Sequence, residues 1–382
     1  MEITLCMIVK NEEKYIRMCL ENALPFVDRA VVVDTGSTDK TLEILAEFGS
    51  KVEIRHFDWI DDFAAARNHS LENITGDWIL VLDADEKLVC DPAMLRNLLK
   101  KSNKQAYDVT LESLVGGETL LAKVYARIFR NRGYRYFRAI HEQLNLGQDT
   151  VGNLEPPICK IIHYGYSADN LQDKNKIERN LSILLAEHRE NPSDAFLCYH
   201  IGAAHGAKKD FSMALEYYFR CLELNEGKAY SPYHGALYKK VALTYLELKR
   251  FEECADFIDS IIKKDAFRQF VDLFFIKGLC LKQLKRYEEA EKTFGDCLQI
   301  GDSRQFESLT GRGSFLAQLE LARIFRESGR EPLVVPAYVE AVLHPRNLNR
   351  EGFDEFSAYL QEHDLHEIKN ELEKLAGRKE SN

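Results

Sequence analysis

The sequence lacks several features that mark common classes of protein. No apolar run approaches the roughly 18 residues that a membrane-spanning helix needs. The start, Met1-Glu2-Ile3-Thr4, has neither the basic nor the apolar region of a signal peptide. The nine cysteines are scattered singly, without a Cys-x-x-Cys pair or a Cys/His cluster at zinc spacing. We therefore expect a cytoplasmic protein with reduced thiols, no membrane span and no disulfide framework.

An excess of positive charge is also missing. The 382 residues carry a formal net charge of −10 at pH 7, with 45% hydrophobic and 29% charged residues. This balance is ordinary for a globular protein and argues against a generally basic nucleic-acid binder. No nucleic-acid partner is therefore expected. The length is sufficient for two domains, each with its own hydrophobic core.

Two familiar nucleotide-binding fingerprints are absent, although the first hundred residues alternate between strand and helix patterns. Neither a Gly-x-Gly-x-x-Gly turn nor a Walker lysine loop is present. Apolar runs at 3–9, 30–33, 52–57 and 78–82 predict buried strands, with helices between them. This alternation indicates a Rossmann-like α/β sheet. Farther along, a helix and two more strands are expected at 92–101, 107–114 and 120–129, with a turn at Gly116-Gly117.

The strand expected at 78–82 ends in three carboxylates, Asp83, Asp85 and Glu86. Ligand sites of open α/β sheets lie outside the carboxyl ends of the strands. Mg²⁺ and Mn²⁺ prefer carboxylate oxygens, and Mg²⁺ is usually shared with substrate phosphates. The stretch therefore favours a metal–diphosphate site, with Mn²⁺ or Mg²⁺ as the ion. Taken alone, an Asp-Ala-Asp is more often an acidic turn that ends a strand.

Two polar residues near strand ends have a structural as well as a functional interpretation. Asn11 follows the first strand and is a good N-cap, with Glu12 and Glu13 expected in the first turn of the next helix. Asp39 follows the second strand and is able to cap a helix over 42–48. For both residues, capping and ligand contact are the two interpretations that stay open.

Four short motifs occur in order at the predicted strand ends. Each is weak alone, but together they resemble the family-two nucleotide-sugar glycosyltransferases, whose GT-A fold has a Rossmann-like mixed sheet. The resemblance covers residues 1 to about 165. The motifs are Met7-Ile8-Val9-Lys10-Asn11-Glu12, Val33-Asp34-Thr35-Gly36-Ser37-Thr38-Asp39, Ala66-Arg67-Asn68 and Leu82-Asp83-Ala84-Asp85-Glu86.

The resemblance implies roles for individual residues. Asp85, the second acid of the pair, would bind the metal, and His163 would contact the metal or the diphosphate. Arg67 would lie beside the base or the diphosphate, and Asp83 would hold the ribose or a metal-bound water. For His163, a satisfied histidine at the end of a strand is the alternative. The uracil and ribose pocket would be lined by Val9, Asn11 and Asp34. Ala84 would belong to the same donor site.

A catalytic base is sought in the polar pair His141-Glu142, which follows the basic, aromatic block at 127–138. Inverting transfer by a single displacement, which the resemblance implies, needs one base within hydrogen-bond reach of the acceptor proton. Glu142 is the first candidate and His141 the second, because the aromatic stretch before them would wall an acceptor pocket. The more usual acidic motif of the family is not legible after residue 100.

From Asn170 the strand signals disappear and charged helical segments take over. Tetratricopeptide repeats pair two helices, with a small residue on the first and another twelve positions later on the second, where the helices touch. We predict an all-α domain of tetratricopeptide-like repeats, with a generic helical bundle as the alternative. The spacing of twelve joins Gly202 to Ala214, Ala242 to Cys254, and Gly278 to Ala290.

The predicted domains are a GT-A domain at 1–168, helical repeats at 169–345 and a helical tail at 346–382. A last repeat, over 319–342, is expected to be degenerate because Pro332 and Pro336 interrupt it. Residues after Pro345 are expected to form a solvated tail that ends in one helix.

A glycosyltransferase domain fused to such repeats resembles the bacterial sublancin-type enzymes, which glycosylate Cys or Ser of bacteriocin peptides. The leading hypothesis is an inverting, metal-dependent transfer from a UDP-sugar to a Cys, Ser or Thr side chain of a peptide or protein held by the repeats. UDP-glucose or UDP-N-acetylglucosamine is the expected donor. Two alternatives stay open: assembly of surface polysaccharide or lipopolysaccharide, and a non-catalytic repeat scaffold. A homodimer is one of the oligomeric states considered.

Overall fold

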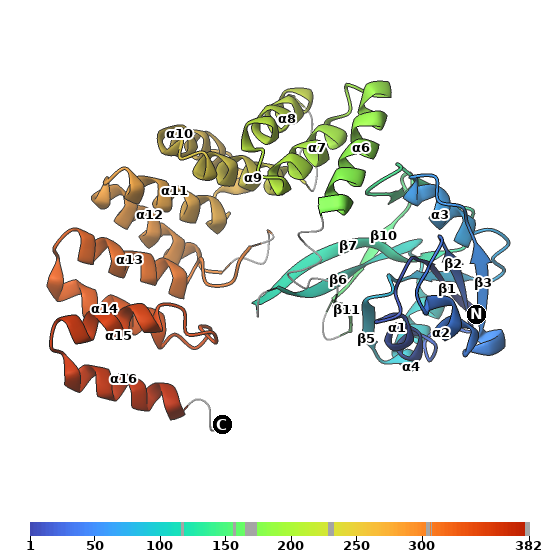
Figure 1. Cartoon of the computed structure of the whole chain (residues 1–382), viewed down its shortest axis with the longest axis horizontal. Coiled ribbons are helices and arrows are strands. Elements are labelled where there is room, and N and C mark those ends of the chain that lie inside the picture. Colours follow the sequence, from blue (N-terminus) through green and yellow to red (C-terminus); the bar gives the residue numbers. More distant parts are fainter. Residues whose placement is uncertain are drawn as a thin grey trace. The chain divides into compact units, whose positions relative to one another are not determined.

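The computed structural model divides the chain into two compact units, Met1–Ser193 and Asp194–Asn382 (Figure 1). It describes residues 1–115, 118–155, 158–164, 174–227, 233–302, 306 and 308–378. The predicted turn at Gly116-Gly117 lies outside these residues. Among the helices described, none combines the length and apolar character that crossing a membrane requires.

The division falls later in the chain than the predicted boundary after residue 168. The reason is helix α6 (Lys174–Glu190), which belongs to the first unit. Its Glu187 forms an ion pair of 3.5 Å with Arg138. The Arg179 guanidinium lies 5.6 Å from the centre of the Phe63 ring.

Four parallel strands form one half of the sheet in the first unit, as their unbroken apolar runs predict. β1 pairs with β2 and with β4, and β2 pairs with β3, all in parallel. Buried residues on both faces of β1, β2 and β4 explain why these runs do not alternate with polar residues. The strands are β1 (Ile3–Val9), β2 (Arg29–Asp34), β3 (Val52–His56) and β4 (Trp78–Val81). The helices that follow strands of this unit are α1 (Ile16–Ala23), α2 (Thr41–Ala46), α3 (Phe63–Ser70) and α4 (Pro92–Lys101), and a 3-10 turn covers Gly49–Lys51.

The other half of the sheet is mixed, and its directions decide which strand ends meet. The order is β3-β2-β1-β4-β7-β6-β11-β5, with β10 also paired to β6. β7 is antiparallel to both β4 and β6, and β11 is parallel to β6, so β11 runs in the same direction as β4. The carboxyl end of β11 therefore lies at the same edge as that of β4. The strands are β5 (Glu86–Cys90), β6 (Ala106–Val115), β7 (Glu118–Arg130), β10 (Val151–Leu154) and β11 (Cys159–His163), while β8 (Tyr136–Phe137) and β9 (Gln143–Leu144) form a separate pair.

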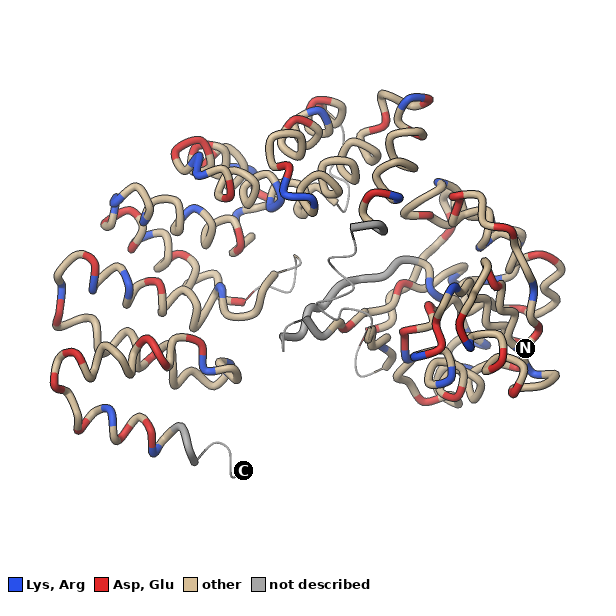
Figure 2. Tube along the Cα trace, viewed as in Figure 1, with Lys and Arg blue, Asp and Glu red and all other residues tan. Residues whose placement is uncertain are grey.

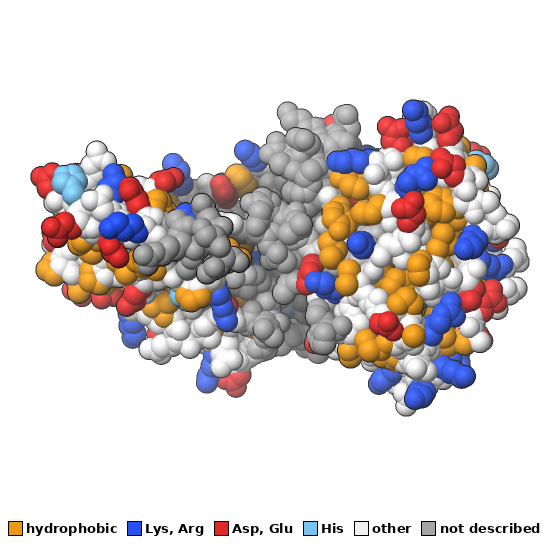
Figure 3. Space-filling view, turned by 90° about the horizontal axis from the view of Figure 1, so that it is seen from below, with side chains coloured by type: hydrophobic (Ala, Val, Ile, Leu, Met, Phe, Trp, Pro, Cys, Tyr) orange, Lys and Arg blue, Asp and Glu red, His pale blue; other side chains and the backbone are white. Residues whose placement is uncertain are grey.

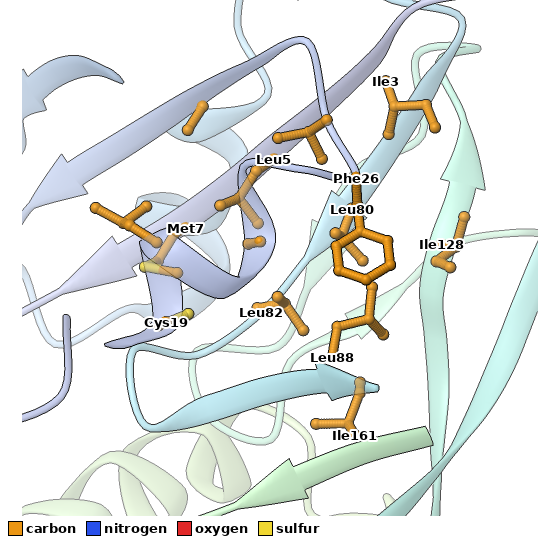
Figure 4. Packing of buried hydrophobic residues seen from close by; sticks show 14 of the residues in the cluster. Ile3, Leu5, Met7, Cys19, Phe26, Leu80, Leu82, Leu88, Ile128 and Ile161 are labelled. Carbon is orange, nitrogen blue, oxygen red and sulfur yellow. The ribbon is translucent and has the colours of Figure 1, made fainter. Parts of the chain in front are cut away.

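The core of the first unit lies between this sheet and its helices. Figure 4 shows Phe26, Leu80 and Leu88 close together, and all three are at least 96% buried. Burying an apolar side chain of this size contributes about 1.5–3 kcal/mol. On the face seen in Figure 3, apolar side chains of this unit are interspersed with charged ones of both signs.

One helix start in the first unit agrees with the predicted helix over 92–101, and another corrects a capping prediction. The Asp91 side chain accepts a hydrogen bond from Met94 N, and Pro92 occupies the first turn of α4, where its missing N–H costs little. Asn11 does not cap α1. That helix begins at Ile16, after a turn, and Glu12 and Glu13 lie outside its first turn.

The second unit consists of helices that follow one another as antiparallel pairs (Figure 1). Lys, Arg, Asp and Glu are interspersed along them rather than gathered by sign (Figure 2). The helices are α7 (Ala195–Ala207), α8 (Phe211–Leu224), α9 (His234–Glu247), α10 (Phe251–Ile262), α11 (Val271–Gln283), α12 (Tyr287–Ile300), α13 (Phe315–Glu327), α14 (Glu331–Val342), α15 (Phe353–Glu362) and α16 (His366–Arg378), with a 3-10 turn at Asp265–Phe267.

The predicted contacts between paired helices are confirmed. A Cβ atom at Gly202 would lie 2.6 Å from the Tyr218 ring, and one at Gly278 would lie 2.7 Å from the Phe294 ring. In the middle pair, the Cys254 thiol donates to the carbonyl of Ala242 at 3.3 Å. Only small residues allow helices to approach this closely.

Two expectations for the end of the chain are wrong. α14 continues through Pro336, and Pro332 lies in its first turn, where no intrahelical N–H bond is lost. Residues 346–382 are not simply a solvated tail, because Phe356 and Leu372 are buried in one cluster with Tyr338 of α14. The last helices thus cover the apolar face of the repeat before them.

Candidate functional site

Polar side chains from distant segments meet at the carboxyl edge of the sheet. Val9 and Asp34 are the last residues of β1 and β2, and each is 3% exposed. The acidic turn 83–86 follows β4, and His163 ends β11. The parallel course of β1, β2, β4 and β11 brings these four positions to one edge.

The loops after β1 and β2 are tied to each other. The Asn11 side chain, on a residue with left-handed φ of 57°, accepts a hydrogen bond from Thr38 N at 2.8 Å. Asp34 accepts from Gly36 N at 3.0 Å, in a turn that Gly36 enters with φ of 98°. Asp39 accepts from Thr41 N at 2.9 Å and from Glu13 N at 3.1 Å. These bonds fix the shape of the loops that follow β1 and β2.

A chain of alternating charges runs through the acidic turn. Arg67 donates from Nε to Glu142 at 2.5 Å and from Nη2 to Asp83 Oδ1 at 2.7 Å. Arg127 donates from Nη2 to Asp83 Oδ2 at 3.2 Å and to Glu86 at 2.7 Å. Arg67 and Glu86 are 8% and 1% exposed. Both carboxylate oxygens of Asp83 are therefore held by arginine, so a ribose or metal-bound water there would compete with two guanidinium groups.

The two paired acids of the turn respond differently to these surroundings. Burial alone would raise the pKa of the Asp83 carboxyl, but the Arg67 and Arg127 guanidinium groups outweigh it and hold the pKa well below its usual range. For Glu86, burial dominates and raises the pKa to about 7, although Arg127 opposes it. Glu86 also accepts from the backbone N of Asp83 at 2.8 Å, which closes the turn.

Asp85 points to a different partner. Its Oδ2 lies 3.2 Å from Nε2 of His163, and the two side chains are 22% and 18% exposed. Tyr164 N donates to the Asp85 carbonyl at 2.9 Å, so backbone pairing holds the two segments together. Desolvation would lower the pKa of the His163 imidazole, but the Asp85 carboxylate outweighs it and raises the pKa.

Asp85 and His163 could supply two of the ligands of a divalent cation. A carboxylate oxygen and an imidazole nitrogen, both partly accessible, are ordinary metal donors. In the part of the chain that the structure describes, no group of three or more His, Cys, Asp or Glu residues is placed to hold an ion. The protein therefore offers two donors, and substrate oxygens and water would complete the coordination, as is common for Mg²⁺.

The segment with the two candidate bases is anchored on helix α3. Asn68 Nδ2 donates to the carbonyl of Tyr136 at 2.9 Å, and Tyr136 N donates back to Asn68 Oδ1 at 2.8 Å. Arg67, the preceding residue, holds Glu142. His141 is exposed, with φ of 54°, and partial desolvation lowers the pKa of its imidazole against the opposing effect of Glu142.

The structure thus brings together at one edge the residues predicted for the donor and metal site, Arg67, Asp83, Asp85 and His163, and the first candidate base, Glu142. Ala84 lies in the same turn and is 4% exposed. The sequence did not single out Arg127 or the pairing role of Glu86. In the sequence, Arg127 is one residue of a basic block and Glu86 is the third acid of the turn. Neither pattern shows which residues face each other in the fold.

Comparisons with known proteins match the two units separately. Residues 4–153 match the model of glycosyl transferase family 2. Residues 197–228 and 271–300 match the tetratricopeptide repeat. Among solved structures, YrrB, a TPR protein with an unusual peptide-binding site, is 15% identical, and the match covers 49% of this chain and 88% of YrrB with a TM-score of 0.37.

Two curated relatives resemble parts of the chain. A TPR repeat-containing protein of Synechococcus elongatus is 39% identical over 213 residues, which are 53% of this chain and 51% of the relative. The SPbeta prophage-derived glycosyltransferase SunS of Bacillus subtilis is 29% identical over 214 residues, 51% of this chain and 47% of SunS. The chain thus spans about half the length of these relatives. The first unit contains a glycosyl transferase family 2 domain, which this chain joins to tetratricopeptide repeats.

Proposed function

We propose that the chain transfers a sugar from a UDP-sugar to a Cys, Ser or Thr side chain of a peptide or protein, with a divalent cation as cofactor. The observation that carries the proposal is the Asp85–His163 pair at the carboxyl edge of the sheet, next to the turn that links Asp83 to Arg67 and Glu142. The likeness to SunS, a relative named as a glycosyltransferase, supports the same reaction class.

The donor nucleoside would bind against the loops after β1 and β2. Val9 and Asp34 end those strands, and Asn11 ties the loops together through Thr38. A wall already held by hydrogen bonds loses little freedom when a ligand binds, which favours affinity. The diphosphate would then extend toward the acidic turn.

Asp85 and His163 would hold the cation, because the other acids of the turn are engaged elsewhere. Among the described residues, Asp83 and Glu86 pair with arginine, whereas Asp85 has only histidine as an ionic partner. A divalent cation bound there would neutralise the negative charge that grows on the diphosphate as the anomeric C–O bond breaks. Arg67 and Arg127 keep the turn in the shape that presents Asp85.

Glu142 would accept the acceptor's proton. Arg67 Nε holds its Oε1, and in the described part of the chain Oε2 makes no hydrogen bond. One oxygen is thus oriented and the other is available, which suits a general base. A Cys acceptor would need little help, because the pKa of a free thiol is about 8.5 and the thiolate is strongly nucleophilic. His141 remains the second candidate.

The tetratricopeptide repeats would bind the acceptor. Repeat solenoids present an extended surface that suits a peptide in extended conformation. In this proposal the second unit determines which peptide is modified and the first unit performs the chemistry. The two tasks would then be separable by mutation.

The test is to incubate the protein with a panel of UDP-sugars, a Cys- or Ser-containing peptide library and Mn²⁺ or Mg²⁺, and to measure UDP release and peptide mass. We expect metal-dependent transfer of one sugar. Asp85→Asn should reduce the rate by roughly 10²–10³-fold, the loss seen when one group that stabilises developing charge is removed. Glu47→Gln, which removes a surface acid paired with Arg17, serves as the matched control. Full activity in Asp85→Asn would refute the role of the pair.

A further inference from the structure

Two of the nine free thiols face each other across neighbouring strands. Cys90 ends β5 and Cys159 begins β11, and the antiparallel register pairs them directly. Because residues directly opposite each other in a ladder point to the same face of the sheet, their side chains are neighbours, and Cys90 Sγ also donates to the Asp91 carbonyl at 3.5 Å. Neither residue takes part in the site described above.

The ladder between β5 and β11 shows which kind of pair they form. Tyr164 N donates to the Asp85 carbonyl, so Asp85 and Tyr164 are a hydrogen-bonded pair. Hydrogen-bonded and non-hydrogen-bonded pairs alternate along an antiparallel ladder. Cys90 lies five positions after Asp85 in this ladder. Because five is an odd number of steps, Cys90 and Cys159 are a non-hydrogen-bonded pair. Cα atoms in such pairs lie about 4.5 Å apart, within the roughly 4.4–6.8 Å that a disulfide spans.

The two thiols differ in the way that thiol–disulfide exchange requires. Cys90 is partly exposed, on an edge strand of the sheet, whereas Cys159 is 1% exposed. The neighbouring Cys159 thiol lowers the pKa of Cys90 despite partial burial, whereas Cys90 and burial raise the pKa of Cys159. Cys90 is therefore the accessible nucleophile and Cys159 the resolving thiol.

We propose that Cys90 and Cys159 form a reversible cross-strand disulfide when the protein meets a low-molecular-weight disulfide such as oxidised glutathione. The Cys90 thiolate attacks one glutathione sulfur, breaks its S–S bond and releases one glutathione thiolate. Cys159 then loses its proton and attacks Cys90 Sγ, which releases the second glutathione. Both protein thiols are oxidised, and the external disulfide is reduced to two thiols that take up the two protons.

The bond would fasten the strand pair that also holds the Asp85–His163 pair. In the same ladder, Glu86 lies opposite His163, at the other end of β5 and β11 from the two cysteines. β5 is an edge strand, paired on one side only by β11. A covalent link at Cys90 and Cys159 would therefore add to the ladder bonds and side-chain contacts that hold this edge strand. The inference does not depend on the proposed sugar transfer.

The experiment treats the native full chain with oxidised glutathione, quenches free thiols with iodoacetamide under denaturing conditions and identifies tryptic peptides by mass spectrometry. We expect peptides 88–96 and 139–160 to appear linked, with a mass two hydrogens below their sum. Dithiothreitol should restore the separate peptides. Alkylated Cys90 and Cys159 after oxidation, or a lasting glutathione adduct on Cys90 without the link, would overturn the proposal.

Two controls separate this pair from general oxidation. Cys159→Ala should accumulate the mixed disulfide on Cys90, because the resolving thiol is missing, and absence of that adduct would also contradict the proposal. Cys254 and Cys280 provide an internal control, since Cys280 is likewise close enough to raise the pKa of Cys254, but both residues are 0% exposed. They should stay reduced under the same native treatment.

Discussion

At the site edge of the first unit, four segments far apart in the chain share a set of buried charges, whereas in the second unit each helix depends on a partner close in sequence. Arg67 joins residues from two other segments, Asp83 and Glu142. Gly278 and Phe294, by contrast, lie on consecutive helices of one pair. The first arrangement gathers charged groups at one place, as a reaction site requires. The second extends a surface by adding further helix pairs.

This difference predicts how far the destabilising effect of a mutation extends in each unit. Removing one member of the charged set leaves other charges buried without a partner, so the loss should exceed that of a single contact. Removing the fit between two helices should affect mainly that pair and its neighbours. The following variants test this contrast.

Arg67→Ala should have the largest effect on stability. It leaves Asp83 and Glu142 without this partner, and breaking a buried ion pair costs about 3–5 kcal/mol. Because the Asp83 side chain is 37% exposed, we expect the lower end of this range. Urea unfolding of the first unit measures the loss. Arg17→Ala removes an exposed Arg–Glu pair of 2.7 Å and should lose little, and equal losses would show that burial does not matter here.

Gly278→Ala should destabilise the second unit by about 1–3 kcal/mol through overpacking. Its new Cβ atom would lie 2.7–2.9 Å from the buried Phe294 ring, so the ring or the two helices must shift. Thermal unfolding followed by circular dichroism reports the loss, and UDP binding should be unchanged. Loss of UDP binding in this variant would mean that damage in the repeats reaches the first unit.

Gly295→Ala is the matched change in the partner helix and should act in the opposite direction. Nothing lies within 4 Å of a Cβ atom at that position. Replacing a helical glycine by alanine then gains about 0.5–1 kcal/mol. A destabilised Gly295→Ala would show that the glycine is needed for a reason other than space.

The smallest expected effect concerns the pH dependence of Cys90. The neighbouring Cys159 thiol lowers the pKa of Cys90 from the usual value of a free thiol. The rate of alkylation by iodoacetamide should rise with pH as the thiolate forms, with a midpoint below that of a free cysteine. In Cys159→Ala the midpoint should move upward, and an unchanged midpoint would show that Cys159 has no effect on Cys90.

Much of the fold could be predicted from the sequence because its signals are local. The unbroken apolar run Trp78–Leu82 predicts a strand buried on both faces, and the Gly202–Ala214 spacing predicts a helix contact. β5 and β10 were not predicted as separate strands, and a strand ending at His163 was considered only as an alternative, since such short runs become strands only through their neighbours in the sheet.

The site was predictable in its residues but not in its pairings. Asp85 and His163 were both candidates, yet only the shared direction of β4 and β11 explains why they meet. Arg127 was one of several arginines in a basic block, and its contact with Glu86 depends on the register of β7 against β4. Asn11 was a reasonable cap by residue type, but its left-handed φ turns it toward Thr38.

The most direct test of the central claim is the binding of UDP measured by isothermal titration calorimetry, with Mn²⁺ and then with EDTA. If Asp85 and His163 hold a cation that also binds the diphosphate, EDTA should weaken UDP binding to the native protein by about tenfold or more, or about 1.4 kcal/mol. In Asp85→Asn, UDP should bind weakly and equally under both conditions. Equal affinity for UDP with and without Mn²⁺ in the native protein would contradict the account.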